Sequence, residues 1–323
     1  MPSVSEPRPL VDGEPSDAVF RADVMNGLRR RPKCLPCKYF YDEKGSELFD
    51  RICELDAYYL TRTELAIMRR FAPEMARQIG SGAMLVELGS GSSVKSRLLL
   101  DRLTAPAAYV PVDISKEHLD RTARGLALDY RHLEILPVCA DFTEDFELPA
   151  PRRRPTRTTV YFPGSSIGNF EPEAARHLLG RIAGMCGRGG GLLIGIDLKK
   201  DRATIEAAYD DAGGVTAAFN LNLLRRINRT LGADFRLDRF EHRAVYNEEL
   251  GRVEIGLVSR CVQTVTIEGK TFEFDRGEEI RTEHCHKYSI EGFAERAAHV
   301  GLSLRCRWTD AQSRLAVLYL TAL

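Results

Sequence analysis

The sequence predicts an α/β protein in which a doubly wound, mainly parallel sheet carries a second, α+β domain. Three observations support this fold class. Short apolar segments alternate with amphipathic helical segments from about residue 63 to residue 198. A glycine-rich turn follows the first apolar segment, residues 84–88. Beyond residue 198 the alternation gives way to period-2 segments, which are typical of antiparallel strands.

The first domain is expected to alternate strands and helices. The helices are predicted from 3.6-residue periodicity, and the strands from short apolar runs bounded by turn residues. The expected strands are 84–88, 108–112, 134–138, 158–162 and 190–196, and the expected helices are 63–79, 95–103, 115–130 and 171–185. Ser115 is the predicted N-cap of the third helix. Strands joined through helices pair in parallel by right-handed crossovers, with helices on both faces of the sheet.

The segments outside that pattern are expected to form the second domain. Residues 203–231 are predicted to be helical with a break at Gly213-Gly214, and residues 244–274 to be strands with a hairpin turn at Glu268-Gly269-Lys270. The chain then returns to the first domain through a helix at 289–300 and a closing hairpin of 303–308 and 315–320.

These patterns define the expected domain boundaries. We expect the first domain to comprise residues 63–198 and 287–323. The second, formed by the N-terminus and an insertion, is expected to comprise residues 1–62 and 199–286.

Composition indicates a globular protein that acts on a small molecule. The 323 residues are 44% hydrophobic, which is enough for a large core. Lysine plus arginine and aspartate plus glutamate both total 46, so the chain has no basic excess for nucleic acid. No apolar run reaches the roughly 18 residues of a membrane span, and residues 1–17 lack a signal-peptide pattern. We therefore expect a cytoplasmic monomer with no nucleic-acid or membrane partner.

The cysteines do not indicate a metal site. Cys34 and Cys37 have the CxxC spacing of redox and zinc sites, but a zinc site normally has a second pair of ligands. The segment His284-Cys285-His286 is the candidate for that pair, and its spacing does not match. We therefore predict free thiols and no metal.

A glycine turn after the first strand predicts a ligand site. The segment Glu87-Leu-Gly89-Ser-Gly91-Ser-Ser93 precedes a helix, and its glycines let the backbone approach a ligand at the carboxyl edge of the sheet. The third glycine of the dinucleotide fingerprint is missing after Gly89 and Gly91, which argues against a pyrophosphate.

Acidic residues end the next two strands. Asp113 follows the second strand, where a carboxylate can accept hydrogen bonds from the hydroxyls of a ribose. Asp141 and Phe142 follow the third strand and offer an acceptor for an amino group and a ring that packs on a purine. Together with the glycine turn, these residues fit S-adenosylmethionine (SAM) better than NAD, so the sequence predicts a SAM-dependent methyltransferase. The alternative is that the acids only cap loops.

Longer motifs make the prediction more specific. They are LPCKYFYDEKGSELF (35–49), YYLTRTE (58–64), VELGSG (86–91), GSSIGN (164–169) and AYDDAGGVTAAFN (208–220). With these motifs the chain resembles the bacterial L-histidine Nα-methyltransferases of ergothioneine biosynthesis (EgtD type) from about Pro32 to the C-terminus. The resemblance implies a Rossmann-like class I methyltransferase sheet with a second, substrate-binding α+β domain. It also implies that the enzyme trimethylates the α-amino group of L-histidine with SAM, which gives hercynine.

The resemblance also implies roles for individual residues. The positions that match the family's SAM-binding residues are Gly89, Gly91, Lys95, Asp113, Asp141 and Phe142. Tyr58, Asn169 and Tyr209 match residues that hold the carboxylate and amino end of the substrate, and Tyr41 lies near the amine in such enzymes. Glu283 matches the acid that binds the imidazole, in a charge-assisted hydrogen bond.

The imidazole end departs from the family pattern. Cys285 replaces the serine of the family's Glu-x-Ser pair, and Ile255 stands where the family has a methionine, followed by Gly256 where an aromatic is common. Another, aromatic amino acid is therefore an alternative substrate. A non-catalytic regulator that binds SAM is a second alternative, which would not need Tyr58 and Asn169.

Several of these residues also have structural interpretations. The tyrosines could be core residues with satisfied hydroxyls, Asn169 could cap the helix that follows it, and Lys95 could be a solvated helix residue. His284 is expected to point away from Glu283, because side chains alternate along a strand.

Overall fold

The computed structural model describes residues 11–13, 16–91 and 93–323 and divides into two compact units. The first unit comprises residues 1–14, 60–199 and 287–323, and the second comprises residues 15–59 and 200–286. The largest difference from the expected domains is at the N-terminus, because β1 (Val11–Gly13) pairs with a strand of the first unit. The breaks after residues 59 and 199 lie within three residues of the expected ones. Residues 1–10, 14 and 15 of the expected segment 1–62 lie outside the described residues.

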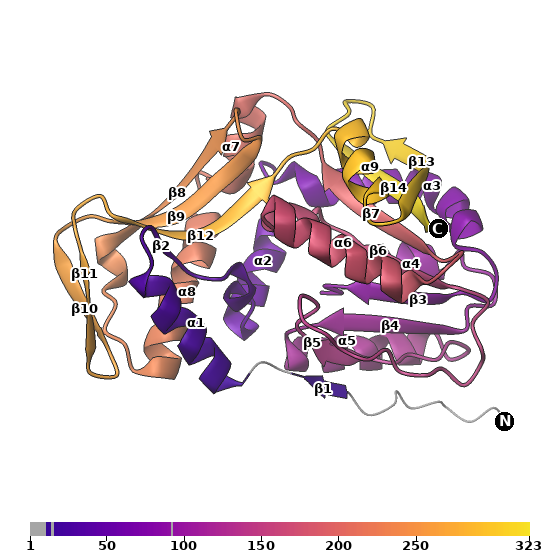
Figure 1. Cartoon of the computed structure of the whole chain (residues 1–323), viewed down its shortest axis with the longest axis horizontal. Helices are drawn as coiled ribbons and strands as arrows, with labels where there is room; N and C mark the ends of the chain where they lie inside the picture. Colours follow the sequence, from indigo (N-terminus) through magenta and orange to yellow (C-terminus); the bar gives the residue numbers. More distant parts are fainter. Residues whose placement is uncertain (1–10, 14–15, 92) are drawn as a thin grey trace. The chain divides into compact units, whose positions relative to one another are not determined.

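The first unit is built on an eight-stranded sheet (Figure 1). The strands lie in the order β1, β5 (Val138–Ala140), β4 (Ala108–Asp113), β3 (Met84–Leu88), β6 (Thr158–Phe162), β7 (Gly191–Asp197), β14 (Leu315–Ala322) and β13 (Leu302–Thr309). In this spatial order, the first six strands, which begin with β1 and end with β7, are parallel to their neighbours, and β14 runs antiparallel to both of its neighbours. This arrangement confirms the expected Rossmann-like class I methyltransferase sheet, including the closing hairpin.

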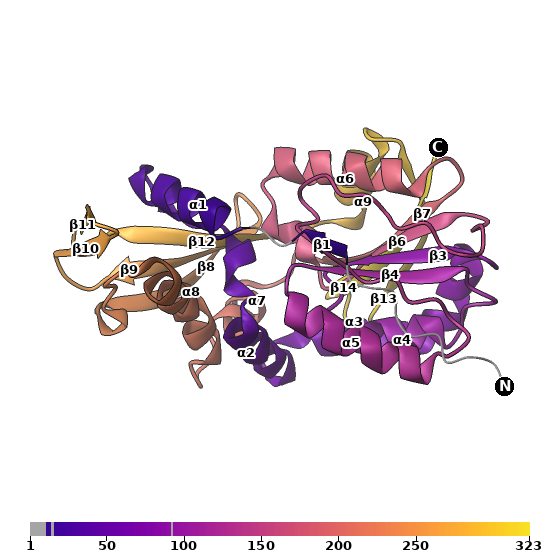
Figure 2. The ribbon, with the colours of Figure 1, turned by 90° about the horizontal axis from the view of Figure 1, so that it is seen from below.

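Helices cover both faces of this sheet (Figure 2). One face carries α6 (Pro172–Cys186) and α9 (Ile290–Ala298), and the other carries α3 (Tyr59–Ile79), α4 (Val94–Leu100) and α5 (Lys116–Asp129). Every residue of β3 and β7 is buried, as expected for a parallel sheet covered on both sides. Each such Leu, Ile or Val contributes about 1.5–3 kcal/mol by leaving water.

The second unit combines a four-stranded sheet with helices. The sheet order is β2 (Lys33–Cys34), β12 (Glu279–His286), β9 (Arg252–Ser259) and β8 (Phe240–Asn247), and β10 (Gln263–Ile267) and β11 (Lys270–Phe274) form the predicted hairpin. Its helical elements are α1 (Asp17–Arg29), η1 (Cys37–Phe40), α2 (Glu43–Glu54), α7 (Arg202–Tyr209), α8 (Val215–Leu231) and η3 (Leu237–Arg239). This is the α+β architecture that the sequence predicts.

One local expectation is wrong. The third strand of the first unit was expected at 134–138 and lies at Val138–Ala140, because Pro137 has no N–H to donate to a ladder; residue 135 makes only an isolated bridge. Ser115 occupies the expected N-cap position of α5, although its side chain makes no cap hydrogen bond. Within the described residues, no helix is long and apolar enough to cross a membrane.

Candidate active site

The glycine turn of the first unit adopts a backbone conformation that requires glycine. Gly89 and Gly91 have φ values of +71° and +47°. Among the described residues, a Cβ at Gly89 would meet only the ring of Phe142, at 3.8 Å, and a Cβ at Gly91 would have nothing within 4 Å. The backbone of this turn is therefore open to close approach by a ligand.

Ser90, between the two glycines, provides a test of whether the turn fits a ligand. Ser90 is 5% exposed, and its Oγ is buried without a hydrogen-bond partner among the described residues. A buried hydroxyl that lacks a partner costs free energy, so such a group in a native site indicates a missing acceptor or donor. The turn therefore suits a polar ligand.

Asp113, at the end of β4, both supports the turn and can still bind. Its Oδ2 accepts a hydrogen bond from the Gly91 N–H at 3.0 Å, and its Oδ1 accepts one from the Ser115 N–H at 3.0 Å. Asp113 therefore caps the loop through these two hydrogen bonds. A carboxylate offers about four lone-pair positions, so two remain for the hydroxyls of a ribose.

The segment after β5 places Phe142 beside the glycine turn. The Asp141 Oδ1 accepts hydrogen bonds from the backbone N–H and the Oγ1 of Thr143, at 2.9 and 2.5 Å. The Phe142 ring packs edge-on against Phe162, with ring centroids 5.4 Å apart. The structure therefore brings together Gly89 and Phe142, which are far apart in the sequence.

Arg181 of α6 supports this segment and was missed from the sequence. Its guanidinium donates to the carbonyl oxygens of Thr143 and Glu144, and pairs with the Asp145 carboxylate at 3.1 Å. An isolated arginine on an amphipathic helix carries no sequence signal for such a role, because the bonds join residues about 40 positions apart.

Lys95 in the first turn of α4 is not only a solvated residue. Its ammonium donates to the carboxylate of Glu64 on α3, which is fully buried, while the Lys95 side chain is 18% exposed. Glu64 was also missed as a site residue, although it ends one of the motifs that carry the family resemblance.

Glu87, directly before the turn, is a buried acid with two hydroxyl partners. It is 1% exposed, and it accepts hydrogen bonds from Ser96 Oγ and from Tyr109 OH. Burial raises the pKa of Glu87 to about 7, although these hydrogen bonds oppose the rise.

Asn169 ends the 3₁₀ helix η2 (Ser166–Asn169), after β6. It does not cap α6, because that helix begins at Pro172 with Glu171 in the N-cap position. The turn before it is strained: Ser165 has a φ of 59°, and its Oγ accepts a hydrogen bond from the Asp197 N–H at 2.8 Å. A non-glycine residue held in the left-handed region is typical of functional loops.

The three tyrosines that were expected in the site lie in one aromatic cluster of the second unit. Tyr58 lies edge-on to Tyr209 and to Phe49, with centroids 6.2 and 6.3 Å apart. Tyr41 lies edge-on to both Phe49 and Phe219, at 5.6 Å from each. The structure therefore brings Tyr41, Tyr58 and Tyr209 together through two phenylalanines that the sequence did not single out.

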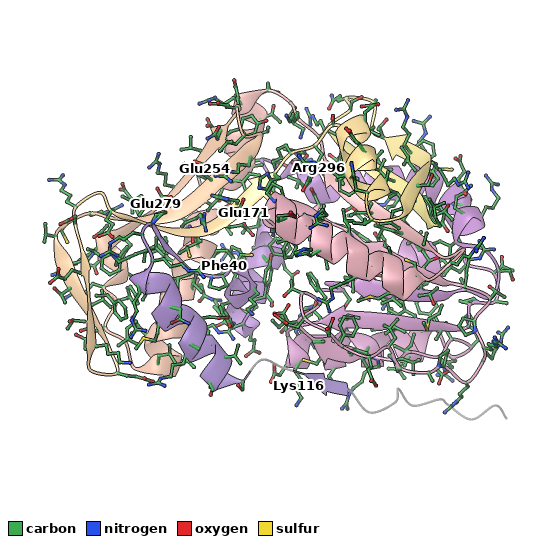
Figure 3. The ribbon with its side chains drawn as sticks, in the orientation of Figure 1. Phe40, Lys116, Glu171, Glu254, Glu279 and Arg296 are labelled. Carbon is green, nitrogen blue, oxygen red and sulfur yellow. The ribbon has the colours of Figure 1, made fainter. Side chains whose placement is uncertain are left out.

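The scaffold of this cluster is α8. Phe219 packs against Phe40, which is labelled in Figure 3, with centroids 4.8 Å apart. Asp42, next to Tyr41, accepts hydrogen bonds from Asn222 and Arg229 of α8, both at 2.7 Å. Although burial opposes the effect, the hydrogen bond from Arg229 and those from Gly45 and Asn222 lower the pKa of Asp42. The segment that carries Tyr41 is therefore tied to the helix that carries Phe219.

The expected imidazole-binding residues share one face of the sheet in the second unit. Glu283 of β12 pairs in register with Ile255 of β9, so both side chains project to the same side, together with Cys285. The Cys285 Sγ lies 2.9 Å from the Tyr209 hydroxyl. Burial raises the pKa of Tyr58 well above its ordinary value, with smaller contributions from Cys53 and Cys285.

Gly256 lies on the other face of β9. A Cβ there would lie 2.0 Å from the Oε1 of Glu279, whose Oε2 accepts a hydrogen bond from Arg243 at 3.2 Å. Glu279 is labelled in Figure 3. The glycine therefore makes room for this ion pair and does not line the face of Glu283. His284 and His286 lie with ring centroids 6.3 Å apart, because residues two positions apart project to the same side of a strand.

The fold and the glycine turn with its acidic neighbours define a SAM-dependent methyltransferase of class I. A family model described as "Histidine-specific methyltransferase, SAM-dependent" matches residues 20–322. The chain belongs to this family.

Named relatives agree with this assignment. The chain is 43% identical to a histidine N-alpha-methyltransferase of Mycobacterium tuberculosis, over 90% of this chain and 91% of that protein. It is 42% identical to a histidine N-alpha-methyltransferase of Mycolicibacterium smegmatis, with the same coverage. It is 34% identical to the ergothioneine biosynthesis protein 1 of Neurospora crassa, over 86% of this chain and 32% of that longer protein.

Proposed function

We propose that the protein transfers three methyl groups from SAM to the α-amino group of L-histidine, which gives hercynine as a step in ergothioneine synthesis. Family membership supports the reaction class. The observation that carries the choice of acceptor is the common face of β12 and β9, on which Glu283 stands two residues from Cys285, with Tyr209 in contact with the Cys285 thiol. The enzyme is proposed to act as a monomer in the cytoplasm, without a metal.

The tyrosine hydroxyls of the second unit are proposed to bind the carboxylate of the amino acid. Tyr58 keeps its proton at any physiological pH, because burial raises its pKa. A protonated phenol donates to a carboxylate and cannot repel it by charge. Tyr209 is proposed to donate alongside it, since its hydroxyl lies on the side of the cluster nearest Cys285.

Glu283 is proposed to select histidine. An ionised carboxylate accepts a hydrogen bond from the imidazole N–H, and an amino acid without such a donor would leave the acid desolvated and unpaired. Sites built around such a bond reject analogues that lack the donor by large factors. Cys285 is a weak donor and acceptor in place of the family's serine, so Glu283 carries more of the selection here.

The amine must be neutral and aligned before it can attack. SAM supplies a methyl group on a positively charged sulfur, and that charge lowers the pKa of an amine placed beside it. Asn169 is proposed to orient the nitrogen through its amide oxygen, and Tyr41 to contact the same group. Orientation of this kind supplies much of the rate, so no strong general base is needed.

The first unit is proposed to bind SAM through its strand ends. Gly89 and Gly91 allow close approach of the amino-acid portion, and Lys95 is proposed to approach its carboxylate. Asp113 is proposed to accept from the ribose hydroxyls. Asp141 and Phe142 are proposed to hold the adenine, by its amino group and by its ring.

One experiment tests this proposal. The protein is incubated with SAM and each of the common amino acids in turn, and the products are followed by mass spectrometry. Stepwise addition of three methyl groups to histidine, and to no other amino acid at a comparable rate, is the expected result. If histidine is returned unchanged while another amino acid is methylated, the proposed acceptor is wrong.

A second candidate is another aromatic amino acid. It is favoured by Ile255 and Cys285, which make the face beside Glu283 more apolar than the family's methionine and serine pattern. The same experiment decides between the two, because tryptophan, phenylalanine and tyrosine are among the amino acids tested.

A further inference from the structure

The carboxylate of Glu64 joins two segments that carry proposed site residues. Glu64 belongs to α3 and is fully buried. One segment is the start of α4, which follows the glycine turn and carries Lys95. The other is the turn after β6, which begins at Gly164 and ends at Asn169.

Both oxygens of Glu64 are used in these contacts. Oε1 and Oε2 accept from the Gly164 N–H at 3.1 and 3.0 Å, and Oε2 also accepts from the Lys95 ammonium. A Cβ at Gly195 of β7 would lie 2.2 Å from Oε1, so the glycine at that position leaves room for the carboxylate. Lys95 Nζ lies 3.7 Å from where a Gly164 Cβ would stand.

The rest of the turn from Gly164 to Asn169 is bonded to the end of β7 and to Tyr288, both in the first unit. Ser165 Oγ accepts from the Asp197 N–H at 2.8 Å, and the Tyr288 hydroxyl donates to the Ile167 carbonyl oxygen at 3.3 Å. The contacts with Glu64 tie this turn to α3 and, through Lys95, to the segment that is proposed to bind SAM. A buried carboxylate with several donors is costly to displace, and so fixes their relative positions.

We infer that Glu64 is a positioning residue for methyl transfer. It sets the Lys95 ammonium and the Gly164–Asn169 turn in fixed positions relative to each other, and thereby aligns the two reactants. This inference rests on the proposed function, because Lys95 and Asn169 are there assigned to the donor and the amine. Glu64 itself contacts neither reactant in this scheme.

The test is the Glu64→Gln variant, which keeps the shape of the side chain. The amide has one oxygen in place of two, so it can accept from Gly164 and Lys95 only at one position and without a negative charge, and its NH₂ group accepts from neither. Lys95 then loses its ion pair and can turn toward water through its exposed fraction. Misplacement by about 1 Å costs on the order of a hundredfold in rate, so we expect kcat at saturating substrates to fall at least about thirtyfold. The Kd for S-adenosylhomocysteine, measured by calorimetry, should stay within about threefold of the wild type, because Lys95 keeps its charge.

A matched control lies on the same helix. Glu74→Gln removes a carboxylate that accepts from Trp308 Nε1 at 2.9 Å, and should leave kcat within about twofold. Wild-type kcat in folded Glu64→Gln would overturn the inference. A parallel loss of kcat, S-adenosylhomocysteine affinity and melting temperature would also overturn it, since that pattern indicates a purely structural role. If Glu64→Gln does not fold, Glu64→Asp replaces it: the charge remains but the reach is one methylene shorter, and the same fall in kcat is expected.

A second readout separates this inference from the proposed function. The Gly164 amide proton can be observed by NMR in glycine-labelled protein to which no amino-acid substrate is added. Its chemical shift should move upfield in Glu64→Gln, because a hydrogen bond to a carboxylate is stronger than one to an amide. An unmoved signal overturns the inference. Failure of the wild-type protein to methylate histidine overturns the proposed function alone.

Discussion

The raised pKa of Glu87 predicts how stability changes with pH. Its pKa is about 7 in the folded chain against an ordinary value of 4.5, because the carboxyl is buried. Between these two values the folded state holds a proton that the unfolded state has released. The contribution of Glu87 to stability is therefore fully present below pH 4.5 and is lost as the pH rises through about 7.

The Glu87→Gln variant removes this titration while it keeps an acceptor for the hydroxyls of Ser96 and Tyr109. At about 1.4 kcal/mol per pH unit, the difference between 4.5 and about 7 is worth roughly 3 kcal/mol in total, most of which falls between pH 5 and pH 8. We therefore expect the free energy of unfolding of Glu87→Gln, relative to wild type, to rise by about that amount from pH 5 to pH 8.

Urea unfolding at both pH values, followed by circular dichroism, measures this difference. Glu117→Gln is the control, because Glu117 is an exposed acid on α5 of the same unit. Its relative stability should change by less than about 0.5 kcal/mol over the same range. If Glu87→Gln follows the wild type as closely as the control does, the carboxyl of Glu87 is ionised in the folded protein and the reasoning fails.

Four further predictions concern the site. Glu283→Ala should lower kcat/KM for histidine by at least about a hundredfold with an unchanged Kd for S-adenosylhomocysteine; normal methylation of histidine would remove Glu283 from the site. Tyr58→Phe and Asn169→Ala should each raise the histidine KM at least about tenfold, and unchanged steady-state kinetics would contradict both assignments. Arg181→Ala should weaken S-adenosylhomocysteine binding about fivefold, because the Asp141–Phe142 segment loses its support, and calorimetry would refute this by showing wild-type affinity. Treatment with EDTA should leave the rate of histidine methylation unchanged, and a loss that added metal restores would show that a metal takes part.

Local patterns in the sequence were sufficient for most of the first unit. The strands β3 and β6 lie at the expected residues, because a short run of mainly apolar and β-branched residues between turn residues leaves little choice of position. The glycines of the turn were identifiable because positive φ values exclude most other residues. The strand β5 was misplaced because the apolar run around it continues across Pro137, which breaks the ladder.

The site residues were predicted unevenly. Tyr58, Asn169 and Tyr209 lie within long motifs, so the resemblance identified them. Residue patterns alone could not have selected the two tyrosines among the eleven in the chain. Phe49 and Phe219 also lie within the motifs of the family. They were not predicted as site residues, because an aromatic residue in an amphipathic helix is usually a core residue. The cluster that joins them to Tyr41 depends on the packing of α2 against α8, which no local pattern describes.

The sequence by itself determined the class of fold, the glycine turn, and the acids at the ends of successive strands, since each depends on residues that are neighbours in the chain. Only the tertiary structure decided which partners these groups have. The contact of Glu64 with Gly164 joins residues 100 positions apart, and that of Tyr209 with Cys285 joins residues 76 apart. Such pairs leave no periodic signal, because a hydrogen bond depends on positions in space that are set by the packing of whole elements.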